Sequence, residues 1–117
     1  FLFHDPVLSA KYVKAPTNEA EVETRLKNHF ATARLAWEPR FHDVLLDKWI
    51  DRIRVPALTL WGRDDRVIPP FYADYYAKRL GSGASVVLLD ACGHMPHLEQ
   101  PAAFAEAVTR FLAGVAR

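Results

Sequence analysis

Residues 57–65 read ALTLWGRDD, and this stretch decides the fold class. It opens with a short, nearly continuous apolar run, which is typical of a strand that is buried on both faces. Gly62 interrupts the run, and a charged loop begins at Arg63. A strand of this kind predicts a sheet with neighbouring strands at its edges and helices on both of its faces.

The same pattern occurs again toward the C-terminus. Proline is tolerated in the first turn of a helix, so Pro69 and Pro70 predict a helix start, and this helix is expected to run to Leu80. Residues 85–89 form a second apolar strand, and a last helix is expected to begin at Pro101. The order strand, helix, strand, helix predicts parallel pairing through a right-handed crossover.

The N-terminal part is helical by its periodicity. Between Asn18 and Trp37 the apolar residues recur every three or four positions, which is the period of a helix. Asn18 lies three residues before Glu21, which resembles a capping box. Pro39 ends this helix, and a second short helix is expected over residues 41–50.

The composition excludes several classes of protein. Fifteen Lys and Arg residues oppose fourteen Asp and Glu residues, and the resulting formal charge of +1 is too small for a nucleic-acid binder. The single cysteine, Cys92, excludes an internal disulfide framework. No run approaches the roughly twenty apolar residues of a membrane span. We therefore expect neither a nucleic-acid nor a membrane partner, and we expect a cytoplasmic location.

The strands predict that the chain is part of a larger protein. Only two buried strands are expected, and a two-stranded sheet is marginally stable in water. The sequence also begins at Phe1 with neither an initiator methionine nor a signal-peptide pattern. We therefore expect a processed or truncated segment that forms one end of a larger α/β sheet.

Each predicted strand is followed by a loop with one residue suited to catalysis. Asp65 follows the first strand, and His94 follows the second. Ligands of open parallel sheets bind at the carboxyl ends of the strands, so the two loops are expected to meet at one site. A carboxylate bonded to one imidazole nitrogen fixes the tautomer and frees the other nitrogen to act as a base. Gly93 is expected to let the backbone turn so that the ring of His94 faces inward.

Two motifs carry a resemblance to a known family. Residues 60–69 read LWGRDDRVIP and resemble the acid-bearing segment of α/β-hydrolase-fold enzymes, in which the pattern is G-x-x-D-x-x-x-P. Residues 92–101 read CGHMPHLEQP and resemble the segment that holds the catalytic histidine of that family. The resemblance extends from Arg54 to the C-terminus, and the style of the motifs is similar to that of the meta-cleavage-product hydrolases and related esterases.

The resemblance implies an α/β fold class, here the C-terminal part of an α/β-hydrolase fold with two parallel strands and flanking helices. On this basis residues 54–117 form the strand-helix-strand-helix part of the core. Residues 37–40 and 46–54 resemble the end of the family's helical lid. Residues 1–53 are therefore expected to be a helical lid-end segment that precedes the core.

The resemblance also implies roles for the two loop residues. His94 would act as general base and then as general acid, and Asp65 would orient it. The substrate would be a small molecule, either an ester or a ketone whose C–C bond is hydrolysed. The family implies no cofactor and no metal.

The nucleophile of the family does not occur among these residues. It sits in G-x-S-x-G, upstream of the acid, whereas the serines here, Ser9, Ser82 and Ser85, have other surroundings. Ser82 lies between two glycines, but in a turn after the acid that is expected to end a helix. We therefore expect the chain to be inactive alone and to require an N-terminal segment that carries the nucleophile.

Two other functions stay open at this point. Without a nucleophile, the chain could be a non-catalytic segment that binds a partner or self-associates through its exposed sheet edge. Alternatively, the missing nucleophile is an aspartate, as in the dehalogenases and epoxide hydrolases that share the fold. The sequence upstream of Phe1 would decide between these functions.

The C-terminal motif contains a second histidine, and two histidines close in sequence can be metal ligands. His97 follows His94 by three positions, a spacing that suits metal ligands on a helix. Pro96 lies between them and argues against such a helix. We expect His97 to be a structural or pocket-lining residue.

The remaining polar and aromatic candidates have structural explanations. Asp64 is expected to form an exposed ion pair with Arg63, its neighbour in the charged loop. Cys92 is expected to be a small buried residue rather than a nucleophile. Trp37 and Arg40 are expected to pack rather than to line a substrate pocket.

Overall fold

The computed structural model describes residues 2–37, 44–81 and 84–116. Contacts divide the chain into two compact units. The first unit combines Phe1–Tyr12 with Ile50–Arg117, and the second consists of Val13–Trp49. Both strands and the loops that follow them lie in the first unit, so the candidate site belongs to that unit alone.

The first unit is built on a parallel pair of strands, β1 (Ala57–Gly62) and β2 (Ala84–Leu89). The pairing is in register from the first residue of each strand to the last, where Gly62 lies opposite Leu89. Helix α4 (Phe71–Arg79) connects the strands. The predicted strand-helix-strand order and the parallel pairing are therefore confirmed.

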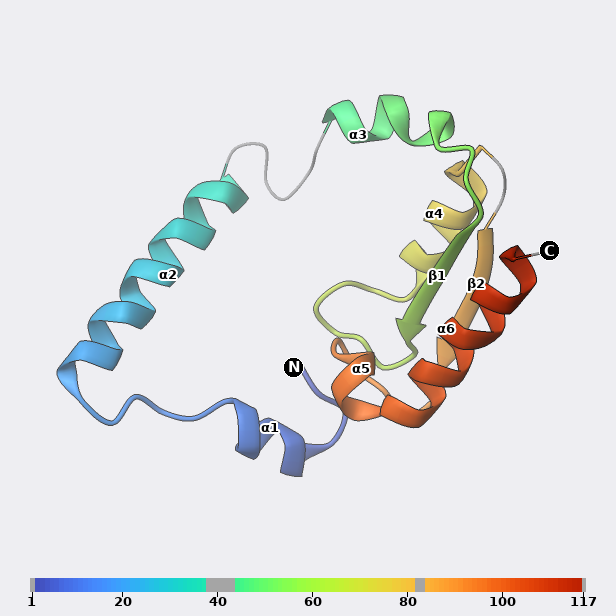
Figure 1. The fold of residues 1–117 in the computed structure, drawn as a ribbon. Coiled ribbons are helices and arrows are strands. Elements are labelled where there is room, and N and C mark those ends of the chain that lie inside the picture. Colours follow the sequence, from blue (N-terminus) through green and yellow to red (C-terminus); the bar gives the residue numbers. More distant parts are fainter. Residues whose placement is uncertain (1, 38–43, 82–83, 117) are drawn as a thin grey trace. The chain divides into compact units, whose positions relative to one another are not determined.

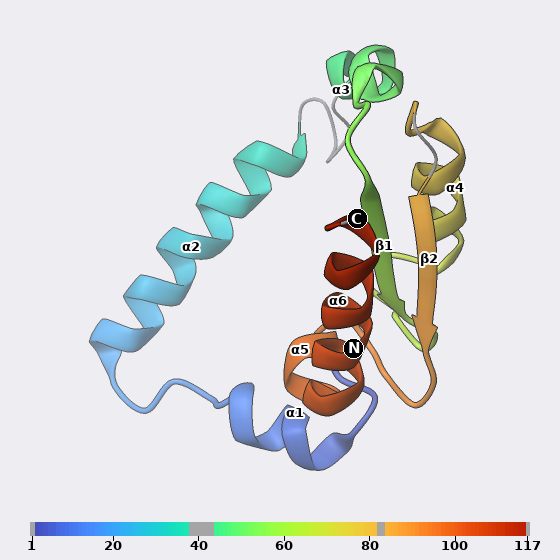
Figure 2. The same cartoon turned by 45° about the vertical axis from the view of Figure 1, so that its right-hand side comes forward.

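Two helices cover opposite faces of the sheet. Successive side chains of a strand point to opposite sides, so the strand residues that a helix contacts show which face it covers. The ring of Trp61 stacks on Tyr76 of α4 with 6.4 Å between centroids, which places α4 on one face. On the other face, Leu58 and Val87 line a groove together with residues of α6 (Pro101–Val115). Figures 1 and 2 show the two strands between these helices, as their doubly apolar character predicted.

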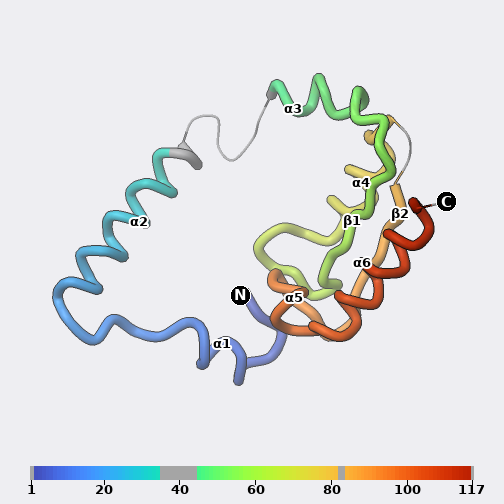
Figure 3. Tube along the Cα trace, in the orientation of Figure 1, coloured from blue at the N-terminus to red at the C-terminus, as the bar shows by residue number. Residues whose placement is uncertain are grey.

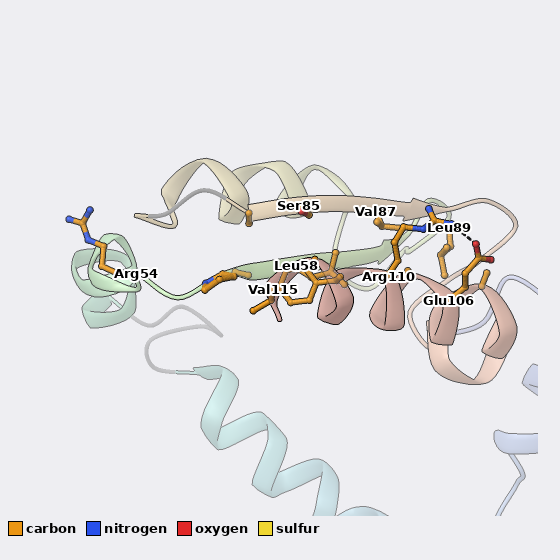
Figure 4. A pocket seen from close by; sticks show the side chains of 15 residues that line it. Arg54, Leu58, Ser85, Val87, Leu89, Glu106, Arg110 and Val115 are labelled. Carbon is orange, nitrogen blue, oxygen red and sulfur yellow. Dashed lines mark hydrogen bonds and ion pairs between the residues drawn. The ribbon is translucent and has the colours of Figure 1, made fainter. Parts of the chain in front are cut away.

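The groove between α6 and the sheet leaves apolar side chains accessible. Its volume is about 950 Å³, and most of the residues that line it are apolar. Figure 4 shows Leu58, Val87 and Leu89 along the groove, with the ion pair of Glu106 and Arg110 toward one end. One helix therefore does not fill this face of the sheet.

We expect the isolated chain to self-associate. Among the described residues each strand has only one hydrogen-bonded neighbour, and an open strand edge beside apolar surface is a template for pairing with another chain. Sedimentation should show dimers or larger species that increase with concentration, and denaturant should unfold the chain over a broad range. A compact monomer with one steep unfolding transition would contradict the view that these strands belong to a larger sheet.

The second unit contains the long helix α2 (Glu19–Trp37). Asn18 caps it, because its Oδ1 accepts a hydrogen bond from the backbone N–H of Glu21 at 2.9 Å. The carboxylate of Glu21 accepts from the backbone N–H of Thr17 at 2.8 Å, whereas a capping box directs it to the N-cap residue itself. The predicted bond between the side chain of Asn18 and the backbone of Glu21 is therefore confirmed. The return bond of the capping box differs, because the carboxylate of Glu21 bonds to Thr17 and not to Asn18.

Helix α3 (Val44–Trp49) bears out the later part of the helix expected over residues 41–50, and positions 41–43 lie outside the described residues. The structure adds short helical elements that were not predicted, namely α1 (Pro6–Tyr12), η1 (Ile50–Arg52) and α5 (Pro96–Glu99). Pro96 occupies the first turn of α5. Because the helix begins at Pro96, His94 lies before it and His97 lies within it, so no helix carries both histidines, as Pro96 predicted.

The assignment of residues 1–53 to a lid-end segment stays a prediction.

None of the helices that the structure describes is both long enough and apolar enough to cross a bilayer.

Candidate active site

The loops that follow β1 and β2 leave the sheet at the same end, as the trace in Figure 3 shows. The backbone N–H of Arg63 donates to the carbonyl of Leu89 at 2.9 Å, which continues the ladder past the end of β1. The backbone N–H of Asp64 donates to the carbonyl of Cys92, also at 2.9 Å. These bonds join the first loop to the second immediately before Asp65.

Two glycines in these loops have no room for a side chain, Gly62 because of the other loop and Gly93 because of the N-terminal residues. A Cβ at Gly62 would lie 2.0 Å from the carbonyl oxygen of Gly93, and a Cβ at Gly93 would lie 2.9 Å from the backbone nitrogen of His4. The residue that turns the backbone after β2 is Ala91, which adopts a φ of 48°. Gly93 is therefore required for close approach, and not for the turn that the sequence suggested.

The structure brings the two predicted site residues together. Nδ1 of His94 lies 2.9 Å from Oδ2 of Asp65. The other carboxylate oxygen of Asp65 accepts hydrogen bonds from the backbone N–H groups of Val67 at 2.8 Å and Ile68 at 3.0 Å. The side chain of Asp65 is 3% exposed and that of His94 is 27% exposed. The carboxylate is thus fixed in the protein, while the imidazole reaches the surface.

The charge state of Asp65 decides which nitrogen of His94 carries a proton. Burial acts to raise the pKa of Asp65, but the hydrogen bonds from His94, Ile68 and Val67 outweigh it and hold the pKa below its usual value. The carboxylate is therefore ionised at neutral pH and can only accept hydrogen bonds. Nδ1 carries the hydrogen of the 2.9 Å contact, so Nε2 of the neutral ring is free to accept a proton.

The two adjacent aspartates turn to different partners. Oδ2 of Asp64 lies 2.9 Å from Nδ1 of His4, and both side chains are partly exposed. Arg63 pairs with Asp90 instead. The expected ion pair between Asp64 and Arg63 is therefore wrong, while the separation of Asp64 from the contact between Asp65 and His94 is as expected.

The other candidates for chemistry lie in structural surroundings. The ring of His97 meets the ring of Phe104 edge-on at 6.1 Å between centroids. In the part of the chain that the structure describes, no three His, Cys, Asp or Glu side chains are placed to hold a metal. Ser82 and Arg40 lie outside the described residues, as does the side chain of Trp37.

Cys92 is buried, as the sequence predicted. Burial, together with the negative charges of Glu99, Asp64 and Asp65, raises the pKa of its thiol to about 11. The thiolate form required for nucleophilic attack is therefore scarce at neutral pH.

Glu99 contacts the backbone around His94 and was not predicted as a site residue. Its Oε1 accepts hydrogen bonds from the backbone N–H groups of Gly93 at 3.0 Å and Met95 at 3.1 Å. Its Oε2 accepts from Gly93 at 3.0 Å and from the backbone N–H of His4 at 2.6 Å. No signal in the sequence singled out Glu99, because its partners are backbone N–H groups, which every residue except proline offers.

A model of the alpha/beta hydrolase family matches residues 2–107, which is most of the chain. The chain belongs to the alpha/beta hydrolase family. The match includes both loops of the candidate site, and it confirms the family that the two motifs predicted. The fold class is likewise confirmed: this hydrolase segment has two parallel strands flanked by helices, in keeping with the C-terminal part of the fold.

Curated relatives of this hydrolase segment are lipases and esterases. Monoacylglycerol lipase ABHD6 of Mus musculus is 38% identical over 66 residues, which cover 56% of this chain and 19% of that protein. Pimeloyl-[acyl-carrier protein] methyl ester esterase of Neisseria meningitidis serogroup A is 35% identical over 66 residues, which cover 56% of this chain and 21% of that protein. The matched region is thus about a fifth of the length of these relatives.

Solved structures resemble the hydrolase segment over more of its length. A serine hydrolase involved in carbazole degradation, the CarC enzyme, aligns with a TM-score of 0.63 and 26% identity over 84% of this chain and 41% of that chain. A bacterial membrane phospholipase A aligns with a TM-score of 0.59 and 26% identity over 99% of this chain and 40% of that chain.

Proposed function

We propose that this segment supplies the acid and the histidine of a hydrolase catalytic triad. His94 is the general base and then the general acid, and Asp65 is the residue that orients it. The observation that carries the proposal is the 2.9 Å contact between Nδ1 of His94 and Oδ2 of the buried Asp65. An ionised, buried carboxylate behind a partly exposed imidazole suits proton transfer at Nε2.

The proposed reaction passes two protons in turn through Nε2 of His94, one from the nucleophile and one from water. As the nucleophile's oxygen attacks the substrate carbonyl carbon, its hydroxyl proton passes to Nε2 of His94. When the ester C–O bond breaks, the imidazolium returns that proton to the departing oxygen. A water molecule then attacks the acyl intermediate, and the same nitrogen accepts its proton and returns it to the nucleophile. Asp65 stays ionised throughout and stabilises the imidazolium.

The nucleophile is proposed to lie outside these residues, since no G-x-S-x-G occurs among them. A serine is favoured over an aspartate because a serine hydrolase is among the similar solved structures. A small-molecule ester is favoured as substrate because the curated relatives are named as a lipase and an esterase. Hydrolysis of a C–C bond next to a ketone is the second candidate reaction, because the motifs at residues 60–69 and 92–101 resemble those of the meta-cleavage-product hydrolases.

The partner that completes the enzyme is proposed to pair with the open edge of the sheet. β1 and β2 pair only with each other among the described residues, and the apolar groove beside α6 offers further surface. An N-terminal hydrolase segment would cover this surface. In the absence of that segment, a second copy of the chain would pair with the same edge. This pairing is the basis of the self-association expected above.

Complementation tests the proposal. We expect the chain, co-expressed with a hydrolase segment that carries G-x-S-x-G, to hydrolyse an activated aryl ester, and we expect no turnover from either part alone. The reason is that nucleophile and base must meet within hydrogen-bond reach. The measurement is release of the aryl alcohol by the purified complex.

The same segment with its motif serine changed to alanine is the control, and it should restore nothing. If the 117-residue chain alone hydrolyses the ester, and Ser82→Ala removes that activity, the nucleophile lies inside the chain and the proposal is wrong. If a segment with aspartate at the motif position restores turnover of an alkyl halide or an epoxide, while the serine segment restores no ester hydrolysis, the chain belongs to a dehalogenase or an epoxide hydrolase.

A further inference from the structure

The carboxylate of Glu99 collects backbone N–H groups from around the candidate base. The N–H groups of Gly93, Met95 and His4 all point at its two oxygens, at distances between 2.6 and 3.1 Å. Gly93 and Met95 are the residues immediately before and after His94. A single ionised side chain therefore holds the backbone on both sides of the histidine with charge-assisted hydrogen bonds, which are stronger than neutral ones.

The same carboxylate also connects this loop to the N-terminal segment. Its Oε2 accepts from the N–H of His4, and two residues earlier the carbonyl of Leu2 accepts the N–H of His94 at 2.8 Å. Gly93 packs against this segment so tightly that a Cβ there would meet His4 and Leu2. Residues 93–95 are thus held from two sides, by Glu99 and by residues 2–4.

We propose that Glu99 is a positioning residue, whose charged carboxylate fixes the backbone of residues 93–95 so that the imidazole of His94 meets Asp65. This inference rests on the proposed function, because it concerns the proposed base. It adds a residue whose hydrogen bonds, among the described residues, go to backbone N–H groups, so that it acts through the conformation of the loop.

Both oxygens of Glu99 accept backbone hydrogen bonds, and this makes glutamine a sharp test. Whichever way the amide of Glu99→Gln is turned, its NH₂ group faces at least one backbone N–H, because Oε1 serves Gly93 and Met95 while Oε2 serves Gly93 and His4. The side chain keeps its size, so the substitution removes the charge and one acceptor without leaving a cavity. Glu23→Gln is the matched control, since Glu23 is exposed on α2 and pairs with Lys27 four positions later.

The first readout is the ring N–H proton of His94 in the isotope-labelled chain within the complemented complex, where the open sheet edge is proposed to be covered. In the unsubstituted chain and in Glu23→Gln, we expect a downfield resonance for the Nδ1–H that is bonded to Asp65. In Glu99→Gln, we expect this resonance to be lost to solvent exchange while the backbone amides that pair β1 with β2 remain protected. Retention of the resonance in Glu99→Gln, or loss of protection across the whole sheet, would overturn the positioning role.

The second readout is turnover of the complemented enzyme. We expect Glu99→Gln to lower kcat about 10²-fold with little change in KM, because misplacement of a catalytic group by about 1 Å has an effect of this size. Glu99→Asp keeps the charge and should recover part of the loss, whereas an equal loss in both variants would overturn the requirement for charge. Failure of the proposed function would look different, since the unsubstituted complex would then show no turnover while the ring N–H comparison still reports on Glu99.

Discussion

His94→Ala is expected to lower kcat of the complemented enzyme on the order of 10⁶-fold, because removal of the base leaves only substrate binding and oxyanion stabilisation. His94 is placed for this role by its Nδ1, which is held 2.9 Å from Asp65, and by the partial exposure of its ring. The loss should appear in kcat at saturating ester, with folding of the variant checked by circular dichroism.

His97→Ala is the matched control, since it removes an imidazole only three positions away. The ring of His97 meets Phe104 edge-on, so we expect its loss to leave kcat nearly unchanged. If His97→Ala is instead the inactive variant, the roles of the two histidines are reversed. If both variants keep full activity, the base lies outside this loop.

The strands and long helices could be predicted because each has a local cause. β1 and β2 are apolar on both faces, and prolines mark the starts of α4 and α6. The single turn of α5 was missed because a helix of this length has almost no periodicity. The association of residues 1–12 with the core was missed for another reason: it depends on contacts such as His4 with Asp64, between residues distant in sequence.

The candidate site could likewise be predicted only in part. Asp65 and His94 could be predicted to meet, because parallel strands bring their carboxyl ends to one edge and each of the two loops offers one suitable side chain. Glu99 could not be singled out by residue type, since its contacts are with backbone N–H groups that any sequence possesses. The loop around His94 was expected to need Gly93 for a turn, whereas the structure uses it for close packing against Leu2 and His4.

Asp65→Asn is expected to lower kcat on the order of 10⁴-fold by forcing the histidine into the wrong tautomer. The N–H groups of Val67 and Ile68 both donate to Oδ1 of Asp65, so the carbonyl oxygen of asparagine would take that position. Its NH₂ group would then face Nδ1 of His94 in place of Oδ2. Nδ1 would have to accept this hydrogen bond, and the ring hydrogen would move to Nε2, where the base must be free.

Asp64→Asn makes the same chemical change one position earlier and separates this mechanism from a general effect of charge. Asp64 is partly exposed and its carboxylate contacts His4, not His94, so its loss should change kcat only slightly. Both variants are to be compared at saturating ester over the same pH range. A severe loss in Asp64→Asn with an active Asp65→Asn would reverse the assignment of the acid. Equal and small losses would mean that the contact between Asp65 and His94 does not serve catalysis, because the tautomer argument allows no mild effect at Asp65.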